Sequence, residues 1–117
     1  MADLEYPKRQ ETKYKGLDIM APRISEDMLQ DMYELFASIN DPEDFKLFLD
    51  DLCTYKELEQ MAGRIAAAKL FMDGKTYMQV IDATNISSAT LSRVSRCVQY
   101  GEGYKKVLTQ TAPKEEK

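Results

Sequence analysis

Apolar residues recur at intervals of three and four from residue 25 onward, and almost no segment alternates apolar and polar residues over the length of a strand. This period places the apolar side chains on one face of a helix. The pattern predicts an all-α fold whose helical domain covers residues 25–111. We expect a flexible N-terminal arm at 1–24 and a polar tail at 112–117.

Capping signals divide this pattern into helices. Ser25 is an N-cap candidate for a first helix, and Asn40-Asp41-Pro42 ends it and begins a second, because proline suits the first position of a helix. Thr54-x-x-Glu57 is a capping box that begins a third helix, and Gly74 ends it. The apolar stripes of these helices are Met28, Met32, Leu35, Phe36 and Ile39 in the first, Phe45, Phe48, Leu49 and Leu52 in the second, where we expect the stripe to be buried, and Leu58, Met61, Ile65 and Met72 in the third.

The third helix also carries small residues, Ala62 and Ala66 to Ala68. Side chains this short let a neighbouring helix come near, because the distance between helix axes depends on the side chains at the contact. We therefore expect close helix–helix packing on this side of the third helix.

The segment from Thr76 to Gln99 predicts two short helices joined by a tight turn. Thr76-x-x-Gln79 is a second capping box, and Ser87 caps the following helix. Asn85 stands at the turn, where it is one of the few non-glycine residues that tolerate left-handed backbone geometry. The inward apolar positions that such a pair requires are Ile81, Ile86, Leu91 and Val94, and a last short helix is expected near Tyr104 to Gln110.

The positions left on the outer faces of this pair are small, hydroxyl-bearing or basic. Such a surface suits a recognition helix, because hydroxyls and arginines can bond phosphates and base edges in the major groove. A solvated helical hairpin with an accidental Ser/Thr/Arg face is the alternative. The predicted DNA-binding residues are Lys75, Thr76, Ser87, Ser88, Thr90, Ser92, Arg93 and Arg96, with further phosphate contacts from Lys105 and Lys106.

The overall charge of −4 is unfavourable for a DNA-binding protein, but the charge is unevenly distributed. Residues 25–60 carry eleven acidic residues and two lysines, a net charge of −9, whereas residues 61–106 carry seven basic and three acidic residues, a net charge of +4. The basic part coincides with the predicted DNA-binding pair. This coincidence favours a DNA partner over a merely solvated charged face.

The composition argues against several other functions. There is no histidine, no phosphate-binding glycine loop and no plausible pair of nucleophile and base, so we predict neither an enzyme nor a metal site. Cys53 and Cys97 are expected to be buried free thiols of a cytoplasmic protein rather than a disulfide. No apolar run reaches the length of a transmembrane helix, and the N-terminus does not resemble a secretory signal, so no membrane partner is expected.

Four segments resemble tryptophan-repressor-like proteins, specifically the YerC/YecD-type branch. They are FLDDLCTYKELEQMAGRIAAAKLF at 48–71, GKTY at 74–77, SATLSRVSRC at 88–97 and YGEGY at 100–104, and the resemblance extends over roughly 80 residues from Met28 onward. It implies a helical, interwoven homodimer in which N-terminal helices of one chain pack on the other. Such a dimer presents two recognition helices to half-sites ~34–36 Å apart. The alternative is that these helices fold back on their own chain.

The resemblance also implies a candidate effector site. In the tryptophan repressor, two arginines enclose the indole and a threonine lines the site, and the matching residues here are Thr54, Arg64 and Arg93. The repressor has a glycine next to the second arginine, where this chain has Val94, whose side chain could fill the ligand's space. L-tryptophan, another small effector and no small ligand therefore all remain open.

The function predicted from the sequence is a sequence-specific DNA-binding transcriptional regulator, in particular a repressor, that acts as a helix-turn-helix homodimer. The alternative is a protein-interaction module that keeps the fold without specific DNA binding and works through its acidic half. The basic cluster at 61–106 discriminates between them, because the second hypothesis leaves it unused.

Overall fold

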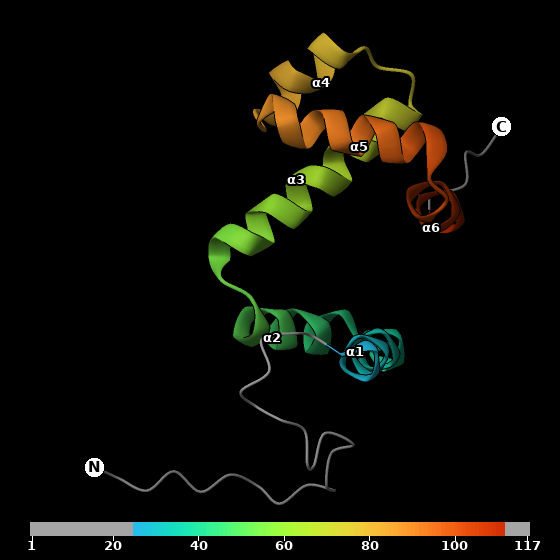
Figure 1. Ribbon diagram of the computed structural model, residues 1–117. Helices are drawn as coiled ribbons and strands as arrows, with labels where there is room; N and C mark the ends of the chain where they lie inside the picture. The colour runs from blue at the N-terminus through green and yellow to red at the C-terminus, as the bar shows by residue number, and fades with distance from the viewer. Residues whose placement is uncertain (1–24, 112–117) are drawn as a thin grey trace, which may run out of the picture. The chain divides into compact units, whose positions relative to one another are not determined.

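A computed structural model describes residues 25–111, which form six helices and no strand (Figure 1). This confirms the predicted all-α class. The predicted arm at 1–24 and the tail at 112–117 lie outside the described residues, and a single domain over 25–111 stays a prediction. The helices are α1 (Glu26–Ser38), α2 (Pro42–Leu52), α3 (Tyr55–Met72), α4 (Tyr77–Thr84), α5 (Ser88–Tyr100) and α6 (Gly103–Thr111).

The predicted caps begin the first three helices. The Ser25 hydroxyl accepts a hydrogen bond from the backbone N–H of Met28 at 3.1 Å, which satisfies one of the unpaired amides of α1. At α3, Thr54 Oγ1 accepts from the N–H of Glu57 at 3.1 Å, and Glu57 Oε1 accepts from the N–H of Thr54 at 2.8 Å. The hydrogen bond with the backbone of Thr54 is the largest cause that lowers the pKa of the Glu57 carboxyl, and the hydrogen bond with the Thr54 side chain lowers this pKa further.

The contacts group the chain into two compact units, the first ending at Leu47 and the second beginning at Phe48. In the first unit, Phe36 of α1 and Phe45 of α2 meet edge to face, with ring centroids 5.6 Å apart and an angle of 70° between the planes. No residue of α1 or α2 is buried, however. The predicted burial of the α2 stripe therefore does not occur within the single chain. The packing of α1 and α2 on a second chain, which the resemblance implies, stays a prediction.

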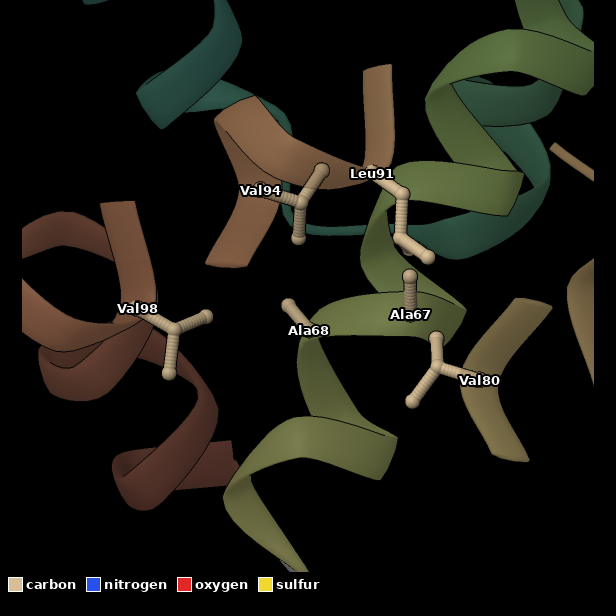
Figure 2. Packing of buried hydrophobic residues seen from close by; sticks show 6 residues of the cluster. All are labelled: Ala67, Ala68, Val80, Leu91, Val94 and Val98. Carbon is tan, nitrogen blue, oxygen red and sulfur yellow. The ribbon is translucent and has the colours of Figure 1, made fainter. Parts of the chain in front are cut away.

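The core of the second unit lies where α4 and α5 pack on α3 (Figure 2). Ala67 and Ala68 of α3 are completely buried, which confirms the expected close packing at these two alanines, whereas Ala62 and Ala66 are exposed. Leu91 and Val94 of α5 are also buried, as predicted. The core is completed by Val80 of α4 and Val98 of α5, and the side chains packed against it include Ile81, Ile86, Tyr104 and Leu108.

The larger apolar residues of α3 continue the side on which Ala68 lies, because positions 61, 65, 68 and 72 recur at spacings of four, three and four. Met61, Ile65 and Met72 are nevertheless between 36% and 45% exposed in the single chain. The core itself forms at Ala67 and Ala68, where α5 packs on α3. The cysteines Cys53 and Cys97 are free thiols as predicted, but they are half-buried rather than buried.

Glycines follow α3 and α5, the first in left-handed and the second in extended backbone geometry. Gly74 follows α3 with a φ of +88°, and its N–H donates to the carbonyl of Phe71 at 3.0 Å. Gly101 follows α5, and its N–H donates to the carbonyl of Cys97 at 2.8 Å. A Cβ at Gly101 would lie only 2.6 Å from that carbonyl oxygen, whereas a Cβ at Gly103 would meet nothing within 4 Å.

We expect Gly101→Ala to lower the free energy of unfolding by about 1–3 kcal/mol, because a backbone carbonyl cannot move aside without breaking the end of α5. Gly103→Ala is the matched control, and we expect it to change stability by less than about 0.5 kcal/mol. Urea denaturation followed by circular dichroism measures both. Equal stability of the two variants would contradict this explanation of Gly101.

Candidate nucleic-acid interface

The pair α4 and α5 is joined by the turn Asn85 to Ser87, as the sequence predicts. Asn85 adopts left-handed geometry, with φ 55° and ψ 30°, and its N–H donates to the carbonyl of Ile81 at 2.9 Å. It is the only described non-glycine residue with a positive φ. Ile86 then turns inward and packs on the core. This turn sets where α5 begins relative to α4.

Two of the predicted DNA-binding hydroxyls cap helices. Thr76 Oγ1 accepts from the N–H of Gln79 at 3.2 Å, and Gln79 Oε1 accepts from the N–H of Thr76 at 2.9 Å. Ser87 Oγ accepts from the N–H of Thr90 at 3.2 Å and donates to Thr90 Oγ1 at 3.0 Å. Both side chains therefore stabilise the starts of helices by capping them, and their contacts with DNA stay predictions.

The predicted residues at the start of α5 and along it divide between two sides of this helix. Ser87 and Thr90 line a cleft of about 420 Å³ together with Lys56 and Gln60 of α3. The second group occupies successive turns of the solvent-facing side, away from the buried Leu91, Val94 and Val98, and is exposed. This second group is Ser88, Ser92, Arg93 and Arg96.

The arginine head groups on this surface are available to a ligand. Within residues 25–111, no hydrogen bond or ion pair engages the guanidinium group of Arg93 or Arg96. Lys75, just before α4, is likewise exposed. Lys105 differs, because its ammonium group donates to the carbonyl of Gln99 at 2.9 Å, beyond the end of the exposed surface.

Tyr77 is a residue of this site that the sequence analysis missed. Its hydroxyl donates to the carbonyl oxygen of Ser88 at 3.1 Å and lies 3.2 Å from Ser92 Oγ, so it joins the start of α4 to the first turns of α5. Its ring lies against that of Phe71, with centroids 6.4 Å apart and 36° between planes. The one signal in the sequence that could have identified Tyr77 is its position at the start of α4, one residue after the cap.

The candidate effector residues do not form a described pocket. Thr54 caps α3 with its hydroxyl, and none of Thr54, Arg64 and Arg93 lines the cleft beside α5. Val94, which the resemblance matches to the repressor's glycine, is only 2% exposed, and its side chain is part of the core (Figure 2). The described residues contain no cluster of three side chains suited to a metal ion, and no helix among them is long and apolar enough to cross a membrane.

Comparison with known proteins identifies the relatives of this arrangement. The uncharacterized protein YerC of Bacillus subtilis (strain 168) is 38% identical over 73 residues, which are 62% of this chain and 70% of YerC. A candidate Trp repressor from Staphylococcus aureus is similar in structure, with a TM-score of 0.69 and 25% identity over 91% of this chain and 100% of that one. A TrpR-like protein from Eubacterium eligens ATCC 27750 has a TM-score of 0.68 and 29% identity over 79% of this chain and 95% of that one.

The sequence pattern characteristic of one family extends across nearly all the described helices. The model of that family, described as Trp repressor protein, matches residues 27–112, which include both compact units and the turn between α4 and α5. The similar structures agree with this match and with the six-helix architecture. The chain therefore belongs to the Trp repressor protein family, as a Trp-repressor-like, YerC-type member.

Proposed function

We propose that this protein is a sequence-specific DNA-binding transcriptional regulator, in particular a repressor, that acts in the cytoplasm as a homodimer. The observation that carries the proposal is the exposed surface of α5, where Arg93 and Arg96 project beside serine hydroxyls from a helix whose other side is anchored on α3. A rigid helix that offers arginines and small hydroxyl residues suits the major groove. Membership of the Trp repressor protein family supports the same function.

Selection from a pool of random duplex DNA tests this function. A dimeric regulator is expected to enrich a roughly palindromic site, because its two-fold axis imposes two equivalent half-sites. If no sequence is enriched and binding stays weak at all sequences, the protein-interaction alternative becomes the better explanation of the fold.

Arg96→Ala is expected to weaken binding to the selected duplex by about fivefold to a hundredfold, as when one base or phosphate contact is lost. Lys69→Ala removes the same charge from α3, outside the proposed surface, and should have a much smaller effect. Fluorescence anisotropy at several salt concentrations measures both affinities, and circular dichroism confirms that each variant is folded. Wild-type affinity of the Arg96 variant would refute its role in DNA binding.

We propose that DNA binding does not depend on tryptophan. The resemblance to the tryptophan repressor assigns the indole a space beside a glycine, and the side chain of Val94 occupies the corresponding position in the core. Close-packed interiors leave no room for a second group in a filled space. The exposed positions of Thr54 and Arg64 give no enclosed alternative.

Addition of L-tryptophan is therefore expected to leave the affinity for the selected duplex unchanged. The same anisotropy titration measures this, with L-alanine as a control that supplies the amino acid group without the indole. A tryptophan-dependent increase in affinity would show that Val94 moves aside for the ligand.

The homodimer is supported by the apolar surface that one chain leaves uncovered. Leu29, Met32 and Leu35 of α1 are between 36% and 45% exposed. A groove of about 520 Å³ on the second unit is lined by Ile65 of α3 and by Tyr104 and Val107 among its other residues, almost all apolar. Contiguous apolar surface of this kind marks an association site. The helices α1 and α2 of a second copy supply apolar stripes that match this surface, because these helices are also uncovered in their own chain.

Ile65→Glu is expected to convert the dimer to a folded monomer, because it places a charge in the apolar groove. Met78→Glu is the matched control, since Met78 is 63% exposed but lies on α4, outside this groove. Light scattering after gel filtration should give twice the 13.4 kDa chain mass for the control and the chain mass for the Ile65 variant. A dimeric Ile65 variant would place the interface elsewhere.

A further inference from the structure

The hydroxyl of Tyr77 lies between two atoms that belong to adjacent turns of α5. Its oxygen is 3.1 Å from the carbonyl oxygen of Ser88 and 3.2 Å from Ser92 Oγ. The ring is half-buried and packs against the core and Phe71, so its position does not depend on the hydroxyl. Two contacts of one hydroxyl thus join the start of α4 to this point of α5.

The chemistry of these groups decides which atom donates in each contact. A carbonyl oxygen has no hydrogen, so the single hydrogen of the Tyr77 hydroxyl must point to Ser88. The contact between Tyr77 and Ser92 then requires the hydrogen of Ser92, which points to the tyrosine oxygen. Ser92 Oγ consequently has no hydrogen left for another partner and offers only its lone pairs.

Ser92 presents these lone pairs on the surface proposed to contact DNA. It is exposed and lies one turn before Arg96 on the same side of α5. A serine whose hydroxyl rotates freely accepts or donates according to its partner and so discriminates weakly between bases. A serine restricted to accepting is mismatched with phosphate oxygens, guanine O6 and thymine O4, but it matches the amino groups of adenine and cytosine.

We propose that Tyr77 is a positioning residue that restricts Ser92 to accepting a hydrogen bond, so that Ser92 recognises the exocyclic amino group of an adenine or a cytosine in the major groove. This inference rests on the proposed DNA-binding function. It adds a specificity to the α5 surface that arginine contacts to phosphate alone do not provide.

Base substitutions in the selected DNA site, specifically transitions, provide the test. Replacing adenine by guanine, or cytosine by thymine, exchanges a major-groove amino donor for a carbonyl acceptor at the same edge position. At one base pair of each half-site, we expect such a transition to weaken wild-type binding by roughly threefold to tenfold through the hydrogen bond to Ser92. Ser92→Ala should largely lose this penalty, which separates the contact from any effect of the transition on DNA shape.

Tyr77→Phe keeps the ring and removes only the hydroxyl. We expect this variant to lose most of the same penalty, because Ser92 then turns its hydrogen toward a carbonyl acceptor. The double variant Tyr77→Phe/Ser92→Ala should match Ser92→Ala alone, since the tyrosine acts through the serine. Tyr55→Phe, at a 77% exposed tyrosine of α3, is the control and should keep the wild-type penalty.

The outcomes separate this inference from the proposed function. A purely structural role of Tyr77 would lower affinity for all sites equally and leave the transition penalties unchanged, which would overturn the inference while DNA binding stands. The inference would also be overturned if the Ser92→Ala variant kept the wild-type transition penalty at every base pair. If the wild-type protein selects no sequence, the proposed function fails, and the inference fails with it.

Discussion

The close contact between α3 and α5 is the constraint on which the rest of the second unit depends. Ala67 and Ala68 are completely buried in one cluster with Leu91 and Val94, and short side chains at a helix contact let the two helices come close. Val80 of α4 joins the same cluster. Because three helices share one small core, a change in the seating of α5 on α3 would also displace α4 and the turn between them.

This packing also determines which residues α5 can offer to a ligand. Since Leu91, Val94 and Val98 are directed into the core, Ser88, Ser92 and Arg96 are directed outward. The same packing buries Val94, the residue on which the proposal of tryptophan-independent binding rests. The two proposals therefore depend on one arrangement of α5 on α3.

The sequence predicts the local features of this fold well and its burial poorly. Capping by Ser25, Thr54 and Thr76 depends on partners within three residues, and the left-handed turn at Asn85 is a property of one residue, so local pattern suffices. The predicted stripe of α2 is not buried within the single chain, because burial depends on what covers a face. The contacts of Tyr77 join residues 11 and 15 positions apart and depend on how α4 crosses α5, which no periodicity encodes.

Helix α3 links the proposed dimer to the proposed DNA surface. It carries Ala67 and Ala68 under α5, and along the side that it shares with Ala68 it carries Met61, Ile65 and Met72, which one chain leaves partly exposed. In the proposed dimer, both the partner and α5 are therefore held by the same 18-residue helix, with no flexible segment between them. The separation of the two copies of α5 then follows from the packing of α3, so that half-site spacing is a property of the helix core rather than of the loops.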